Sequence, residues 1–283
     1  MRQTIVIDSL DDERLGPFRL RERELRPRHL PGRLIKGLAD TDVERIQHGM
    51  FVAEGDLVVE RALDAGCRIV TALVDADAPP PVIETFADNV PVYAASAQAR
   101  KVLTGLGVAL DIIALFERPI LADVISITSI ARRLVVLEDV DNPTNIGAIV
   151  RSAAAFGAEG LILDRNSADP LARRALRVSM GTAFSLRHCR VDDVAETLEG
   201  LRADGFVVCG LTPNKEALSL EEVSLGLSQE SRIILVMGSE RNGLSARSLA
   251  AMTHQVRIPM AEGIDSLNVA AAAAVACYAL FGR

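Results

Sequence analysis

The fold of this chain is decided by the stretch Ile258-Pro259-Met260, which leads, after a turn containing Gly263, into Ser266-Leu267-Asn268 and the small-residue run 269–275. Val256 to Ile258 is an apolar run of strand length, and the small residues after Asn268 suit a tightly packed helix. A strand, a polar loop and a helix are therefore expected to follow one another here.

Two other segments repeat this order. A strand at Leu134 to Leu137 precedes the polar residues 138–145 and a helix-like stretch, and a strand at Ile233 to Met237 precedes the loop 238–244. In open α/β sheets, the loops that follow parallel strands gather at one edge, where ligands bind. The sequence therefore predicts an α/β fold whose ligand site contains four polar residues, Asn145, Glu240, Ser266 and Asn268.

The side chains expected at this edge are two amides, one hydroxyl, one carboxylate and the guanidinium of Arg151. Such groups hold a polar ligand by hydrogen bonds. They include no Ser-His or Cys-His pair, so a covalent intermediate on a nucleophilic side chain is not expected.

Each segment has a simpler explanation when it is taken alone. Asn142 to Asn145 suits a helix start, Gly238 and Gly243 permit turns, Ser266 is a candidate helix cap, and Arg151 is a candidate solvated side chain. Asn145 and Arg151 are also six residues apart, about 240° around a helix, so they converge on one ligand only if Asn145 precedes the helix. The occurrence of all three segments in this order favours a ligand site.

Together, the three segments resemble the signature of the SpoU/TrmH family of RNA ribose 2′-O-methyltransferases. The resemblance runs from Leu134 to the end of the chain. A weaker match, Phe51 to Ala62, resembles the opening of the substrate-binding domain that precedes the catalytic domain in many relatives, a fold similar to ribosomal RNA-binding proteins. The segment Gly107 to Ala114 departs from the usual end of that domain.

The resemblance implies a parallel α/β sheet whose carboxy-terminal portion forms a deep trefoil knot, and a homodimer made through this domain. It also implies that S-adenosyl-L-methionine is held largely by backbone groups in the knot, where Gly238 leaves room for the ligand. The residues implied to hold the cofactor are Leu211, Thr212, Gly238, Ser239, Ile258 and Leu267. The residues implied to act in catalysis are Asn145, Arg151, Glu240, Ser266 and Asn268.

The implied reaction is attack of a ribose 2′-hydroxyl on the sulfonium methyl group, with loss of the hydroxyl proton. Two roles for Arg151 stay open. A guanidinium is normally always protonated, which favours an orienting and electrostatic role toward the developing alkoxide. Family accounts instead make this arginine the base. Asn145 and Glu240 are expected to orient Arg151 and the ribose, while Ser266 and Asn268 are expected to shape their own loop around the cofactor and to help position the nucleotide.

The net charge of −7 argues against a nucleic-acid partner unless basic residues gather locally. They gather in residues 14–36, with eight basic side chains against two acids, and again in residues 173–190. The residues predicted to contact RNA are Arg21, Arg23, Arg26, Arg28, Arg173, Arg174 and Arg177. The alternative explanation of both basic clusters is that they lie on solvated surface helices. Ribosomal RNA is favoured over transfer RNA as the substrate.

Changes in pattern divide the chain into four parts. An arginine-rich arm (1–36) precedes a small α/β RNA-binding domain (37–119), which is expected to open with a helix from Thr41 to His48. A linker (120–132) leads to the methyltransferase domain (133–283), with strands near 134, 160, 184, 206, 233 and 256. A length of 283 residues suits two domains.

The sequence indicates neither export nor membrane insertion, because it lacks an uninterrupted apolar run of about 18 residues. A cytoplasmic protein is therefore expected. The four cysteines and four histidines are not at metal-ligand spacing, so we expect reduced thiols and no metal.

Two other classes compete with an RNA methyltransferase. One is a non-catalytic RNA-binding protein that has kept the fold, but every chemical position named above carries the expected residue type. The other is a doubly wound nucleotide-dependent enzyme, which is disfavoured because the chain has neither Gly-x-Gly-x-x-Gly after its first strand nor Gly-x-x-x-x-Gly-Lys-Ser/Thr.

Overall fold

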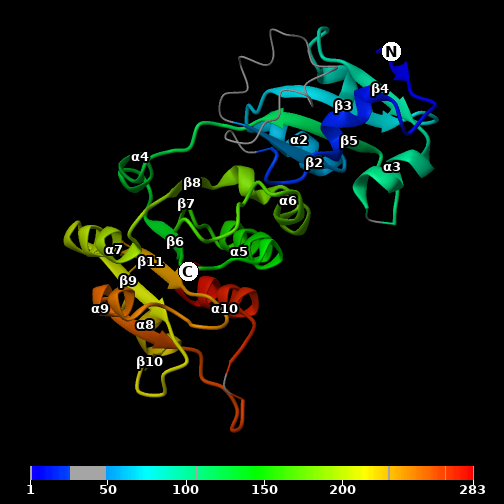
Figure 1. The fold of residues 1–283 in the computed structure, drawn as a ribbon. Coiled ribbons are helices and arrows are strands. Elements are labelled where there is room, and N and C mark those ends of the chain that lie inside the picture. The colour runs from blue at the N-terminus through cyan, green and yellow to red at the C-terminus, as the bar shows by residue number, and fades with distance from the viewer. Residues whose placement is uncertain (1, 26–48, 106, 229, 265, 283) are drawn as a thin grey trace. The chain divides into compact units, whose positions relative to one another are not determined.

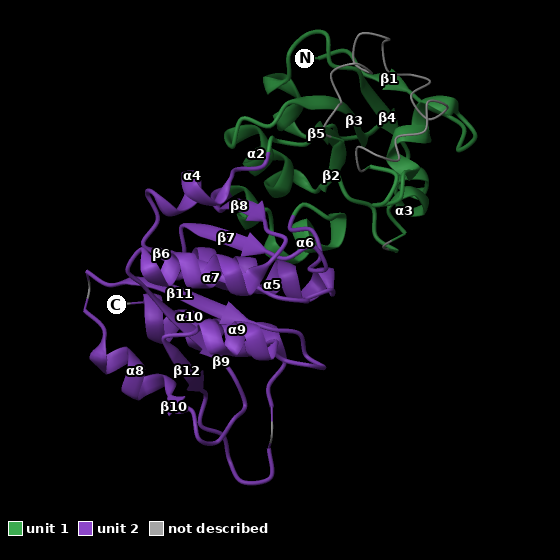
Figure 2. Cartoon of the chain, turned by 60° about the vertical axis from the view of Figure 1, so that its left-hand side comes forward, with its two compact units in different colours: residues 1–120, 171–184 green, residues 121–170, 185–283 purple. Residues whose placement is uncertain are grey.

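The computed structural model describes residues 2–25, 49–105, 107–228, 230–264 and 266–282. The chain folds into two compact units, which Figure 2 distinguishes by colour. Unit 1 consists of residues 1–120 and 171–184, and unit 2 consists of residues 121–170 and 185–283. The predicted helix from Thr41 to His48 lies outside the described residues.

Unit 1 is a small α/β unit around a mixed five-stranded sheet in the order β1-β4-β3-β5-β2. The strands β1, β4 and β3 run parallel, and β5 runs antiparallel to β3 and β2. The strands are β1 Ile5–Val6, β2 Met50–Glu54, β3 Ile69–Asp75, β4 Val92–Ala95 and β5 Ile112–Glu117. The helices are η1 Glu13–Arg19, α2 Asp56–Asp64, η3 Pro81–Thr85, α3 Ala97–Thr104 and α6 Arg173–Ser179, with η4 Thr182–Ser185 at the unit boundary.

The amino terminus differs from the predicted arm. The strand β1 pairs with β4, and η1 places Leu15 and Phe18 in the core of unit 1, where both are 0% exposed. Leu25 is in the same core. Apolar side chains between the arginines bury themselves against the sheet, so the described residues 2–25 are part of unit 1 rather than an arm.

The segment 171–184 also differs from the prediction, because it belongs to unit 1 although the sequence placed it in the methyltransferase domain. Arg173 Nη2 lies 2.8 Å from Glu54 Oε1, and Arg177 Nε lies 3.2 Å from Glu54 Oε2. Phe184 packs against Phe51, with ring centroids 5.5 Å apart. The Glu54 side chain is only 1% exposed, and a buried carboxylate requires such positive partners.

Unit 2 contains a seven-stranded sheet in the order β10-β12-β9-β11-β6-β7-β8, and every pair of neighbouring strands in it is parallel. The predicted parallel α/β fold is therefore confirmed. The strands are β6 Arg133–Leu137, β7 Gly160–Leu163, β8 Arg187–Arg190, β9 Phe206–Leu211, β10 Leu218–Ser219, β11 Arg232–Met237 and β12 His254–Arg257. The strand expected near 184 begins at Arg187, after η4. The deep trefoil knot stays a prediction.

Helices cover both faces of this sheet (Figure 1). Leu134 and Val136 of β6 share a core cluster with Val194 and Leu198 of α7. Alternate strand residues point to opposite faces, so Val135 and Leu137 face the side covered by α5 and α10, which pack against each other. The helices are α4 Val124–Thr128, α5 Pro143–Ala155, α7 Val194–Ala203, α8 Leu220–Gly226, α9 Ala246–Ala251 and α10 Val269–Phe281.

This packing fixes the position of the ligand edge. The four central strands β12, β9, β11 and β6 are neighbours and parallel, so their carboxyl ends meet at one edge of the sheet. In the part of the chain that the structure describes, no helix is long and apolar enough to cross a membrane.

Candidate functional site

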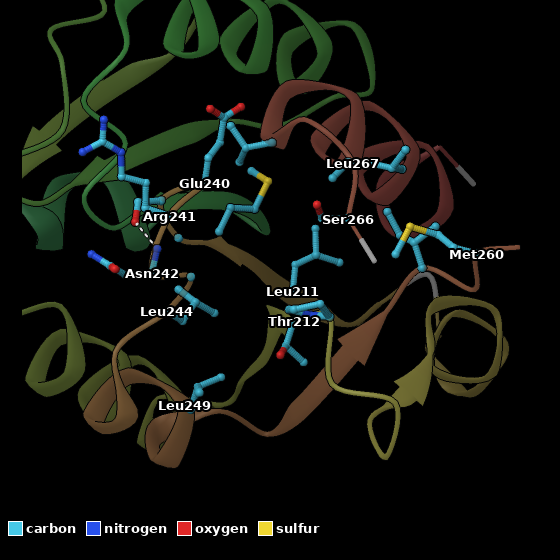
Figure 3. Close-up of a pocket in the computed structure, with 18 residues that line it drawn as sticks. Leu211, Thr212, Glu240, Arg241, Asn242, Leu244, Leu249, Met260, Ser266 and Leu267 are labelled. Carbon is cyan, nitrogen blue, oxygen red and sulfur yellow. Dashed lines mark hydrogen bonds between the residues drawn. The ribbon is translucent and has the colours of Figure 1, made fainter. Parts of the chain in front are cut away.

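A cavity of about 360 Å³ opens where the loops after β9, β11 and β12 meet, at the carboxyl edge of the unit 2 sheet (Figure 3). All six residues that the resemblance assigns to the cofactor line this cavity: Leu211, Thr212, Gly238, Ser239, Ile258 and Leu267. Two residues assigned to catalysis, Glu240 and Ser266, line it as well.

Apolar residues that are not among the six predicted cofactor residues also line the cavity. They are Met237, Leu244, Leu249, Met260, Val269 and Ala272. Leu249 comes from α9 and Ala272 from α10, so helices as well as loops build the cavity. No local pattern marks such residues, because an apolar side chain that lines a cavity looks in sequence like one that packs in the core.

The loop that follows β11, residues 238–244, folds back on itself, and we call it the cofactor loop. Gly243 N donates to Ser239 O at 3.0 Å, and Asn242 N donates to Ser239 Oγ at 3.2 Å. A Cβ atom on Gly238 would lie 2.2 Å from the carbonyl carbon of Gly243. The absence of a side chain at Gly238 therefore permits closure of the loop. The turn that the sequence favours for Gly238 taken alone is therefore observed, and the room that Gly238 leaves for a ligand stays a prediction.

Side chains from the three motif segments meet beside this cavity. Asn268 Nδ2 donates to Asn145 Oδ1 at 3.2 Å and also to Glu240 Oε1. Asn268 Oδ1 accepts hydrogen bonds from Ala270 N at 3.0 Å and Ala271 N at 3.3 Å, which makes Asn268 the N-cap of α10. The oxygen of this amide therefore caps α10, and its nitrogen joins helix α5 to the loop after β11.

Arg151 does not join this group. Asn142 is the N-cap of α5, with Oδ1 2.9 Å from Thr144 N, so Asn145 lies inside the helix rather than before it. Asn145 and Arg151 are then separated by a rotation of about 240° along α5, so their side chains point about 120° apart. Asn145 is 7% exposed, whereas Arg151 is exposed and has no hydrogen bond or ion pair with any described residue. Within one chain, the two side chains therefore do not converge on one ligand.

Ser266 is exposed and lines the cavity. It does not cap the last helix, because α10 begins at Val269 and takes Asn268 as its cap. Its side chain is one of those drawn around the cavity in Figure 3, where it contributes a hydroxyl group.

One of the strands that lead to this edge contains a buried thiol. Cys209 lies in β9, and burial raises the pKa of its thiol to about 12. A thiol with this pKa is protonated at neutral pH. Among the residues that the structure describes, no group of histidine, cysteine and carboxylate side chains is arranged to hold a metal ion.

The basic residues predicted to contact RNA divide into two kinds. Arg21, Arg23 and Arg174 are exposed. Arg173 and Arg177 instead lie beside the single buried carboxylate of Glu54, which balances one of their two positive charges and gives both side chains a structural role; their contact with RNA stays a prediction. Arg26 and Arg28 lie outside the described residues.

The fold and the site together define an α/β protein that binds a small ligand at the carboxyl edge of a parallel sheet. The model of the SpoU rRNA Methylase family matches residues 132–278. The chain therefore belongs to this family, whose members methylate RNA.

Relatives agree with this assignment. The chain is 37% identical over 231 residues to an "uncharacterized tRNA/rRNA methyltransferase" of Mycobacterium bovis, which covers 81% of this chain and 80% of the relative. Among solved structures it is similar to an RNA 2′-O ribose methyltransferase, with a TM-score of 0.73, 28% identity and 98% of each chain covered. It is also similar to the SpoU methyltransferase AviRb of Streptomyces viridochromogenes in complex with AdoMet, with a TM-score of 0.70, 26% identity, and coverage of 86% of this chain and 92% of that chain.

Proposed function

We propose that this protein transfers a methyl group from S-adenosyl-L-methionine to a ribose 2′-hydroxyl in structured RNA. The observation that carries the proposal is the contact of Asn145, Glu240 and Asn268 beside the cavity, because it joins all three motif segments at one point. The similar RNA 2′-O ribose methyltransferase supports the choice of the ribose hydroxyl as the methyl acceptor.

The cavity fits the cofactor by size and by chemistry. Its volume of about 360 Å³ lies within the range of small-molecule sites, roughly 300–1,000 Å³. Apolar side chains such as Leu244 and Leu249 suit the adenine ring, and the loop main chain at Gly238 and Ile258 offers hydrogen-bonding groups. The cofactor supplies an electrophilic methyl group on a sulfonium, and AviRb, a similar protein, binds AdoMet.

The polar residues would position the reactants. Asn268 fixes the carboxylate of Glu240 at the cavity wall, so this carboxylate can accept a hydrogen bond from the ribose. Holding the hydroxyl in line with the methyl group removes much of the entropic cost of their encounter. Within one chain Arg151 points away from these residues, so the Arg151 that acts would have to come from the second copy in the homodimer, where it would stabilise the developing alkoxide as a fixed positive charge. Proton acceptance by this Arg151 is the second hypothesis.

We infer further features of the RNA complex, of the assembly and of the location of the protein. Unit 1 would bind the RNA, with ribosomal RNA favoured over transfer RNA as the substrate. Unit 2 would form a homodimer and contain the deep trefoil knot, and the protein would act in the cytoplasm. A non-catalytic RNA-binding protein that retains the fold is the alternative function.

Two measurements test the proposal. Calorimetry with S-adenosyl-L-methionine is expected to show one site per chain, whereas a non-catalytic protein that has lost the cofactor would show none. Mapping of 2′-O-methyl groups in RNA from a strain that lacks the gene is expected to reveal the loss of one modification. An unchanged map, together with no cofactor binding, would contradict the methyltransferase function.

A further inference from the structure

Glu138, the first residue after β6, makes contacts that the proposed reaction does not use. Its carboxylate accepts two hydrogen bonds from the start of α9, from Ser245 N at 3.0 Å and from Ser248 Oγ at 2.8 Å. The Ser248 side chain is 0% exposed, and Ser245 Oγ donates to Ser248 Oγ at 3.0 Å. A carboxylate shared by two donors in a partly buried position makes strong, charge-assisted hydrogen bonds.

Glu138 thereby holds both ends of the cofactor loop. The loop begins directly after Met237, and Glu138 N donates to Met237 O at 3.0 Å. The loop ends directly before Ser245, which the Glu138 carboxylate holds. The main-chain N–H of Glu138 is therefore bonded to the residue before the loop, and its carboxylate is bonded to the residue after the loop.

Helix capping does not account for these contacts. Ser245 is itself the N-cap of α9, and its own Oγ accepts from Ser248 N at 3.1 Å. Glu138 instead binds the main-chain N–H of the cap residue, which is the point where the loop joins the helix. Its effect is therefore on where the loop ends rather than on whether the helix begins.

We propose that Glu138 is a positioning residue that sets the shape of the cofactor loop, and through it the affinity for S-adenosyl-L-methionine. Glu138 does not line the cavity, whereas the loop contributes Ser239, Glu240 and Leu244 to it. The inference rests on the proposed cofactor site. Without the carboxylate, the loop populates other conformations, and the apparent affinity falls by the fraction of molecules that remain competent to bind.

The first test uses the full chain without cofactor. Amide hydrogen exchange at residues 243–249 is expected to accelerate about tenfold in Glu138→Ala, because Ser245 N loses its acceptor. Glu138→Gln is expected to stay near the parent protein, since its amide oxygen can accept from Ser245 N and its NH₂ can donate to Ser248 Oγ. Asp141→Ala is the matched control, because it removes an exposed carboxylate three residues away that has no hydrogen bond among the described residues.

The second test measures S-adenosyl-L-methionine affinity of the same variants by calorimetry. Glu138→Ala is expected to bind on the order of tenfold more weakly, while Glu138→Gln and Asp141→Ala stay within about twofold. Unchanged exchange, unchanged affinity in Glu138→Ala, or equal loss in Glu138→Gln would each overturn the positioning role. If the parent protein failed to bind the cofactor, the proposed function would fail, and the exchange measurement alone would decide whether Glu138 holds the loop.

Discussion

Asn268 and Asn145 are joined by a hydrogen bond of 3.2 Å across 123 residues of sequence. Because Asn268 also donates to Glu240, this bond links the helix that follows β6 to the loop that follows β11. The amide NH₂ of Asn268 therefore ties together two segments that lie far apart along the chain.

Asn268→Asp is expected to lower methyl transfer about 100-fold with little loss of stability. The carboxylate keeps the N-cap acceptor for Ala270 N and Ala271 N, but it donates no hydrogen bond and it repels Glu240. Initial rates and thermal unfolding of the two proteins check this. Asn268→Ala is the control, because it loses the cap as well and should cost about 1 kcal/mol of unfolding free energy. Equal rates for Asn268→Asp and the parent would remove Asn268 from the site.

Arg151→Ala is expected to abolish methyl transfer while cofactor affinity changes less than severalfold. The guanidinium has no partner among the described residues, so thermal stability should not change either. Kinetics, calorimetry and thermal unfolding of one preparation separate these effects. Equal loss of binding and transfer would show a structural role, and Arg151→Lys with the activity of the parent would contradict both the electrostatic and the base hypothesis.

Gly238→Ala is expected to destabilise the protein by about 1–3 kcal/mol and to weaken cofactor binding at the same time. The added Cβ would lie 2.2 Å from the Gly243 carbonyl carbon and would open the loop. Gly243→Ala adds the same methyl group with nothing within 4 Å of it, at a φ of 66°, and should cost only about 1 kcal/mol. Denaturant unfolding measures both, and a larger loss at Gly243 would contradict the loop geometry.

Acid is expected to weaken a contact between α7 and α9. Hydrogen bonds from Glu196 N and Arg247 hold the pKa of Asp193 below its ordinary value of 3.8. A lowered folded-state pKa stabilises the fold above the unfolded pKa, and this stabilisation is lost as the pH falls through the folded pKa. Asp193→Asn keeps the N-cap but removes the charge, so it should unfold more easily than the parent at pH 7, and this difference should be smaller at pH 3. A constant difference between the two proteins in urea at both pH values would refute this.

The basic amino terminus is best tested by charge removal. Deletion of residues 1–36 would remove Leu15 and Phe18 from the core of unit 1 and unfold it. Arg21→Ala with Arg23→Ala should instead weaken RNA binding and lower its salt slope by about 0.9 for each duplex phosphate that is no longer neutralised. Arg173→Ala is expected to reduce stability rather than the salt slope, because its partner is Glu54. Filter binding over a salt series measures RNA affinity and its salt slope for each variant. An unchanged slope in the double variant would show that the RNA surface lies elsewhere.

The sequence by itself determined the central strands of unit 2 and the order of the three motif segments. The runs at Leu134 to Leu137 and Ile233 to Met237 are apolar over strand length, and each became a buried strand of the parallel sheet. Local pattern was sufficient there because a central parallel strand is buried on both faces, which demands an uninterrupted apolar run. The polar loops after these strands were predictable for the same reason, since parallel strands bring their carboxyl ends to one edge.

Only the tertiary structure decided where side chains pair. Asn142 rather than a later residue caps α5, which places Asn145 in the helix and separates it from Arg151. Burial of Glu54 holds α6 to unit 1, and Glu138 reaches Ser245 across 107 residues. Such pairings depend on which groups, distant in sequence, are buried together in the folded chain. The free-energy cost of burying a charge or an unpaired donor is set by the groups that surround it in space. A periodicity over ten residues carries no information about those neighbours.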